Sequence, residues 1–140
     1  MKTAATILCL SLITTSAFAQ RGAFKSWMKI ADCSVPSSTP GRQPEYVIKV
    51  MRDVDVDQFS KKHLLVQIAI AHPGGPGYGD YMSDVASMKW GPGKKSITIL
   101  TNSFIQVEVK DGMNTRGKVR VINSAPMAAN CNARLTGRLQ

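Results

Sequence analysis

The residues of this sequence that are best suited to covalent chemistry are Cys33 and Cys131, which lie 98 residues apart. The third cysteine, Cys9, lies in the N-terminal segment that we predict to be cleaved off, so two cysteines remain. Two thiols in an oxidising compartment most simply form one disulfide. In the chain-entropy model a loop of this length stabilises the fold by about 4–5 kcal/mol, and native strain subtracts from that figure. The alternatives are two free buried thiols or a bridge between two chains.

The only histidines, His63 and His72, bracket one apolar run. In an extended strand they would lie roughly 30 Å apart, too far to share a metal ion or a catalytic dyad. The sequence also lacks a Gly-x-Ser-x-Gly elbow, and the Gly-rich stretch 72–79 lacks the Gly-Lys-Ser/Thr ending of a phosphate loop. We therefore predict no catalytic residue, no metal and no cofactor.

Three alternate aspartates, Asp53, Asp55 and Asp57, resemble the start of a calcium-binding loop. The pattern fails at the position that requires glycine, where Gln58 stands, and at the position that requires glutamate, where Leu64 stands. A solvated strand end or turn explains the aspartates better than a cation site.

The charge of the chain suggests attraction to anionic partners, and a basic protein without such a partner is the alternative. The sequence has 18 basic and 9 acidic residues, a net charge of +9. Several basic residues alternate with apolar positions and should therefore point outward from strands: Lys25, Lys29, Lys118, Arg120, Arg134 and Arg138. If those strands are neighbours, they form a basic stripe that attracts lipid head groups or envelope polysaccharides. A solvated face with charges that prevent aggregation would give the same pattern. Only Trp27 interleaves with these charges, so we do not expect nucleic acid as a partner.

A long segment, 72–95, is rich in glycine and proline and carries three aromatic residues, Tyr78, Tyr81 and Trp90. Tyrosine and tryptophan are common in interfaces, and long loops on a rigid scaffold are common binding sites. The alternative is a lid whose aromatic side chains plug one end of the core. We expect Tyr78 to be exposed and Trp90 to act as a lid residue.

Period-2 alternation of apolar residues dominates the chain between residues 20 and 140 and predicts about seven strands. The predicted strands are 24–31, 45–52, 64–71, 96–101, 104–110, 117–122 and one that begins at Cys131. Asn102-Ser103 predicts a tight turn, and Asp111-Gly112 opens another. Closure of such a meander predicts an all-β domain, an antiparallel β-sandwich or small barrel with one disulfide.

Within the long segment, Tyr81, Val85 and Met88 stand at i, i+4 and i+7. This spacing predicts one short amphipathic helix, capped by Asp80 and bracketed by Gly-rich turns.

The first nineteen residues predict an export signal. Met1-Lys2 supplies a positive charge, Ile7–Ile13 is a short apolar run, and Ala17-Phe18-Ala19 is a small-x-small cleavage site that resembles bacterial export signals. Cleavage after Ala19 would leave a single β domain of 121 residues, Gln20–Gln140, with a net charge of +8. No second long apolar run follows, so we expect no membrane anchor in that domain.

Three functional hypotheses follow from these features. The leading one is a non-enzymatic, periplasmic or secreted β domain that binds an envelope or anionic partner. The second is an inhibitor or accessory subunit that inserts the Tyr78–Trp90 segment into an exported enzyme. The third is a hydrolase with a site near His72 and Asp80.

Overall fold

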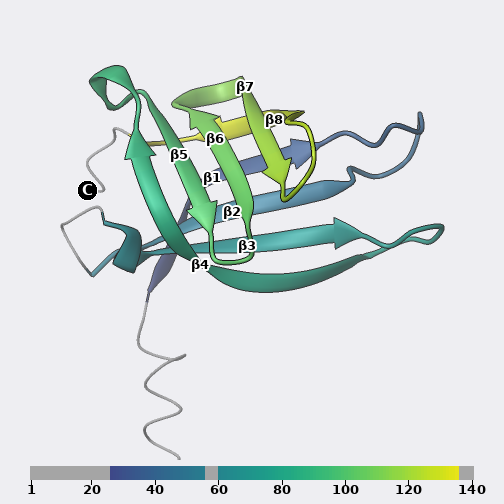
Figure 1. Ribbon diagram of the computed structural model, residues 1–140, viewed down its shortest axis with the longest axis horizontal. Coiled ribbons are helices and arrows are strands. Elements are labelled where there is room, and N and C mark those ends of the chain that lie inside the picture. Colours follow the sequence, from purple (N-terminus) through teal and green to yellow (C-terminus); the bar gives the residue numbers. More distant parts are fainter. Residues whose placement is uncertain (1–25, 56–59, 136–140) are drawn as a thin grey trace, which may run out of the picture.

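The computed structural model describes residues 26–55 and 60–135, which form a closed barrel of eight antiparallel strands (Figure 1). Each strand pairs with the next along the chain, and β8 closes the barrel against β1. The strands are β1 (Trp27–Val35), β2 (Tyr46–Asp53), β3 (Leu64–Ala71), β4 (Tyr78–Trp90), β5 (Ser96–Thr101), β6 (Ile105–Lys110), β7 (Gly112–Val121) and β8 (Met127–Ala133). Two 3-10 turns, η1 (Lys61–His63) and η2 (Pro92–Lys94), precede β3 and β5.

The prediction of an all-β fold that closes as a small barrel is confirmed, with eight strands instead of seven. The predicted signal peptide, residues 1–19, lies outside the described residues. Between residues 26 and 135, leaving out 56–59, no helix is long and apolar enough to cross a membrane.

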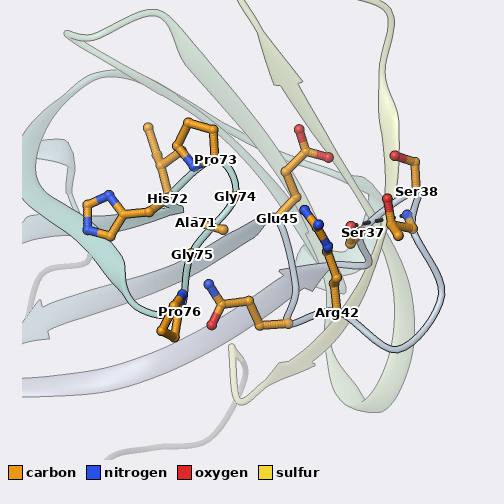
Figure 2. A pocket seen from close by; sticks show the side chains of 13 residues that line it. Ser37, Ser38, Arg42, Glu45, Ala71, His72, Pro73, Gly74, Gly75 and Pro76 are labelled. Atoms are coloured by element: carbon orange, nitrogen blue, oxygen red, sulfur yellow. Dashed lines mark hydrogen bonds between the residues drawn. The ribbon is translucent and has the colours of Figure 1, made fainter.

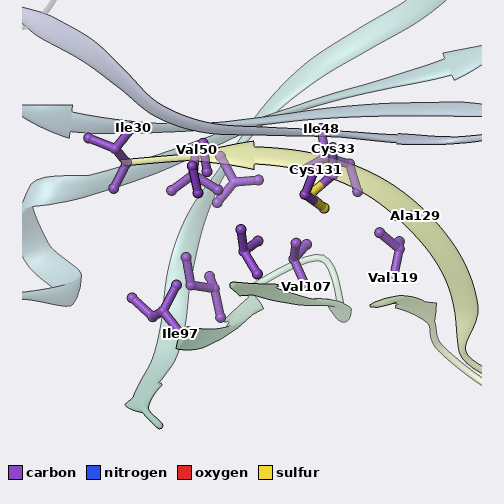
Figure 3. Close-up of a cluster of buried hydrophobic side chains, with 14 of the residues drawn as sticks. Ile30, Cys33, Ile48, Val50, Ile97, Val107, Val119, Ala129 and Cys131 are labelled. Atoms are coloured by element: carbon purple, nitrogen blue, oxygen red, sulfur yellow. A yellow bond between two sulfur atoms is a disulfide. The ribbon is translucent and has the colours of Figure 1, made fainter. Parts of the chain in front are cut away.

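The core lies inside the barrel because alternate residues of each strand face inward. On β3 the predicted apolar face is Leu64, Val66, Ile68 and Ile70; the first three are buried, whereas Ile70 is 37% exposed at the strand end. Figure 3 shows the isoleucine and valine side chains of β2, β5, β6 and β7 converging in the interior. Eight strands give an interior that side chains can fill, so this barrel is packed rather than hollow.

The disulfide between Cys33 and Cys131 closes the barrel from within. The two residues lie directly opposite each other on β1 and β8, with their Cα atoms 4.1 Å apart, and both are buried. The backbone pairing at this seam is short, since only four residue pairs, Ala31–Ser34 with Asn130–Ala133, join β1 to β8. The predicted disulfide and the predicted proximity of the first and last strands are confirmed.

The prediction of a helix in the 72–95 segment is wrong, because its residues belong to β4, the one strand that the sequence pattern did not predict. A β-bulge between Val85 and Ser87 shifts the register of β4 against β5 by one residue. Tyr81 and Val85 therefore share the inner face with Met88, which lies opposite the core residue Ile99. The bulge converts a period-2 pattern into an i, i+4, i+7 spacing that imitates a helix.

The bounds of three strands differ from the prediction by more than one residue. β1 continues to Val35 and begins at Trp27 rather than at Phe24, which lies outside the described residues. β7 begins directly at Gly112, five residues before the predicted start, and β8 begins at Met127 rather than at Cys131. Asparagine, glycine and alanine in these segments have weak strand propensity, so pairing with neighbouring strands decides their structure.

Candidate functional site

Basic charge is concentrated in one half of the barrel. Residues 89–135, from the end of β4 to just beyond β8, contain eight basic and two acidic residues. Residues 26–88 contain six basic and seven acidic residues. The excess positive charge of the barrel therefore lies in residues 89–135, which we call the basic half.

The centre of the basic half is a row of three cations on β7: Arg116, Lys118 and Arg120. All three are exposed on the outer face, and they alternate with the buried residues Gly117 and Val119. Alternate residues of a strand are about 6.6 Å apart along its axis. We call this row the β7 ladder, and its spacing suits a chain that carries repeated negative charges.

A groove runs beside the β7 ladder between β6 and β8. Its volume is about 410 Å³, and it is lined by Lys110, Arg116 and Lys118 together with Glu108 and the apolar segment 126–128. Glu108 lies directly opposite Lys118 on β6, and Ala128 lies opposite it on β8. The groove thus offers three cations, one carboxylate and an apolar wall to a ligand.

The cations of the β7 ladder are available to a ligand. The single ion pair within 4.0 Å among residues 26–55 and 60–135 joins Lys29 to Asp32 on β1, at 2.8 Å. The hydrogen bond from Lys29, followed by that from Asn132, holds the pKa of Asp32 below its usual value. Lys29 is therefore neutralised on its own strand, whereas the β7 ladder has no such partner in the described chain.

The structure supports the predicted stripe in part. Lys118 and Arg120 point outward from β7, as expected from the alternation. Arg134 is exposed just beyond β8, and its backbone N–H donates to the carbonyl of Ile30 on β1. Lys25 and Arg138 lie outside the described residues.

The three aromatic residues Tyr78, Tyr81 and Trp90 do not form one site. Tyr78 and Trp90 are the two end residues of β4, which spans roughly 40 Å at a rise of about 3.3 Å per residue. The expectation that Tyr78 is exposed is wrong, since it is half-buried and its hydroxyl donates to the carbonyl of Pro44 at 2.9 Å. Trp90 is half-buried and packs against the core opposite Ile97, as a lid residue should.

Tyr81 is the most exposed of these aromatic residues, at 39%. Its hydroxyl donates to the Ser103 hydroxyl at 3.5 Å, in the turn between β5 and β6. Burial raises the pKa of Tyr46, and the nearby charges of Glu45 and Tyr81 raise it further. Tyr46 lies opposite Ile70 on one side of β3, and Tyr81 lies opposite Ile68 on its other side, so both tyrosines lie toward the end of the barrel where Ile70 is exposed.

The residues considered for catalysis or metal binding remain apart. His63 and His72 stand at opposite ends of β3, and the His72 ring packs over Gly77 and Gly79. Asp80 accepts a hydrogen bond from Gln67, and no hydrogen bond joins it to His72. The described residues 26–55 and 60–135 contain no group of three or more potential metal ligands.

The described part of the acidic cluster, Asp53 and Asp55, lies where β2 ends in a turn. Asp53 is 5% exposed, and its carboxylate accepts the backbone N–H of Asp55 at 3.1 Å. Asp57 lies outside the described residues. The carboxylate of Asp53 thus stabilises the strand end from which the chain leaves β2.

Two residues of the groove, Lys110 and Arg116, were not among the predicted site residues. Arg116 continues the alternation of Lys118 and Arg120, so extending the predicted strand by one residue would have found it. Lys110 could be assigned to the groove only from the pairing of β6 with β7, which no local sequence pattern reveals.

Comparison of the chain with protein-family models, with curated proteins and with solved structures gives no match.

Proposed function

We propose that this protein is an exported, non-enzymatic barrel that binds an acidic polymer of the cell envelope along the β7 ladder. The observation that carries the proposal is the segregation of charge: eight basic and two acidic residues lie in the basic half, and its central cations have no ion-pair partner in the described chain. A surface of one sign raises the local concentration of an oppositely charged partner and accelerates its association.

A linear polymer fits this surface better than a membrane does. The groove beside β7 is a hollow lined by Lys110, Arg116 and Lys118, whereas a bilayer presents a broad, nearly flat plane of head groups. A chain lying in the groove would also cover the apolar segment 126–128. The regular spacing of Arg116, Lys118 and Arg120 lets successive acidic groups of one chain pair with successive cations.

The test compares two triple variants with the same net charge. Arg116→Gln/Lys118→Gln/Arg120→Gln removes the β7 ladder, and Lys49→Gln/Lys61→Gln/Lys62→Gln removes three exposed cations from the other half. The probe is polygalacturonate, a linear acidic polysaccharide, and titration calorimetry at low salt measures its affinity. Exposed ion pairs contribute about 0.2–1 kcal/mol each, so loss of the ladder should weaken binding about tenfold.

The control variant should bind with nearly the affinity of the natural protein. Equal losses in both variants would show that only total charge matters and would refute the site.

A second experiment measures binding of the natural protein to vesicles of phosphatidylglycerol. Tighter binding to these vesicles than to the polysaccharide would reject the polymer in favour of a lipid surface.

The export part of the proposal rests on the signal-like residues 1–19 and on the disulfide, because structural disulfides persist in oxidising compartments. We expect the protein recovered from the periplasm or medium to begin at Gln20 when its N-terminus is sequenced. A chain that begins at Met1 and stays in the cytoplasm would contradict this.

The inhibitor hypothesis loses the feature on which it was based. It required a long loop carrying Tyr78, Tyr81 and Trp90, and these residues belong to a paired strand instead. Residues 78–84 are paired with β3 and residues 85–90 with β5, so this segment cannot be inserted into a partner as a free loop, and we do not pursue this function.

A further inference from the structure

A second hollow lies at the end of the barrel where two connecting segments project. It has a volume of about 650 Å³ and lies between the β1–β2 loop, residues 36–45, and the β3–β4 turn, residues 72–77. Figure 1 shows both segments extending beyond the barrel at the same end. We call this hollow the rim pocket, and it is separate from the groove beside β7.

Hydrogen bonds hold the two walls of the rim pocket together. The Gln43 side-chain amide donates to the carbonyl of Gly77 at 2.8 Å and accepts the Gly77 N–H at 3.4 Å. The Tyr78 hydroxyl donates to the carbonyl of Pro44, and the N–H of Ala71 donates to the carbonyl of Glu45 at 2.9 Å. A pocket whose walls are already fixed loses little conformational entropy when a ligand binds.

One wall of the rim pocket carries two opposite charges that do not form an ion pair with each other. Arg42 and Glu45 are both exposed, and they do not approach within 4.0 Å as an ion pair. In Figure 2 the Arg42 side chain rises alongside Glu45, while the His72 ring points away from both. A simple anion would be repelled by Glu45, and a simple cation would be repelled by Arg42.

The remaining lining suits an amide backbone with small side chains. Ser37, Ser38 and Thr39 supply hydroxyl groups beside Arg42, and Ile70, Pro73 and Pro76 supply apolar surface. Volumes of about 300–1,000 Å³ are usual for small-molecule sites. The pocket is therefore large enough for a ligand of two or three amino-acid residues.

We propose that the rim pocket binds a short zwitterionic peptide, with its carboxylate on the Arg42 guanidinium and its ammonium group on the Glu45 carboxylate. The guanidinium fork matches both oxygens of a carboxylate, and the Glu45 carboxylate can accept N–H bonds from the ammonium group. This site differs from the polymer site in place and in ligand chemistry, so either can fail without the other.

The test is an NMR titration of the full chain with three peptides: Ala-Ala, N-acetyl-Ala-Ala and Ala-Ala amide. Ala-Ala should shift the signals of residues 37–45 and 71–77. Blocking either terminus should weaken binding about fivefold, the upper range for one exposed ion pair.

Two single variants make the assignment specific. Glu45→Gln should bind Ala-Ala and N-acetyl-Ala-Ala equally, and Arg42→Gln should bind Ala-Ala and Ala-Ala amide equally. Lys49→Gln, an exposed change outside the pocket, is the matched control and should keep the full discrimination. Because Arg42 and Glu45 are exposed, all three variants should melt at the temperature of the natural protein. Binding that ignores both blocking groups, or no shift at the rim pocket, would overturn the proposal.

Discussion

Replacing Cys33 and Cys131 together with alanine is expected to lower the free energy of unfolding by about 4 kcal/mol. The disulfide closes a loop with a sequence separation of 98 residues, and the loss of a crosslink of this length frees the unfolded chain. It also removes the covalent support of the seam, where only four residue pairs join β1 to β8. Urea denaturation, monitored by far-UV circular dichroism, measures the change in stability.

A cavity control separates crosslinking from packing. Val107→Ala removes a small side chain from a fully buried position on β6, away from the seam, and leaves the disulfide in place. The double cysteine variant should lose clearly more stability than this control. It should also show faster hydrogen exchange at the backbone amides of residues 31–34 and 130–133 than elsewhere in the barrel. A loss below about 1 kcal/mol, with uniform exchange, would show that the disulfide is not the closure of the barrel.

Gly117→Ala is expected to lower the free energy of unfolding by about 3 kcal/mol, the upper range for overpacking. Gly117 faces inward on β7 opposite Ala129, next to the disulfide. A Cβ atom there would lie 2.5 Å from the Cys131 sulfur and 2.6 Å from the carbonyl oxygen of Glu108. Neither the crosslinked sulfur nor the strand backbone can move away without disturbing the pairing of β6, β7 and β8.

Gly75→Ala is the matched control, because a Cβ at Gly75 would have no atom within 4 Å. Its stability should change by less than about 0.5 kcal/mol. In the background without the disulfide, Gly117→Ala should cost less than in the natural protein, because one of its two clashes is relieved. Additive effects would show that Gly117 does not make room for the disulfide.

The alternation of apolar residues predicted most of the barrel and its closure. β3 and β5 have the predicted bounds, and an exported chain with two remaining cysteines predicted the disulfide. β4 was missed because its bulge at Val85–Ser87 imitates a helical spacing and because glycine and proline surround it. The pairing of β4 with β3 and β5 overrides these local signals.

Local patterns predicted the functional surfaces less completely. They identified Lys118 and Arg120 because outward alternation is visible along one strand. Lys110 joins them only through the pairing of β6 with β7, and the rim pocket brings residue 42 near residue 76, although β2 and β3 lie between them in the chain. Which residues distant in sequence lie side by side depends on strand register and loop geometry, and a single sequence does not specify these.

The most direct test of the polymer site is the salt dependence of polygalacturonate affinity, measured for the natural protein and the two triple variants. Each cation that displaces a counterion from a linear polyanion steepens the plot of log affinity against log salt by about one. Loss of Arg116, Lys118 and Arg120 should therefore make the slope shallower by about 2–3. Loss of Lys49, Lys61 and Lys62 should leave the slope unchanged. Identical slopes for all three proteins would contradict binding along the β7 ladder.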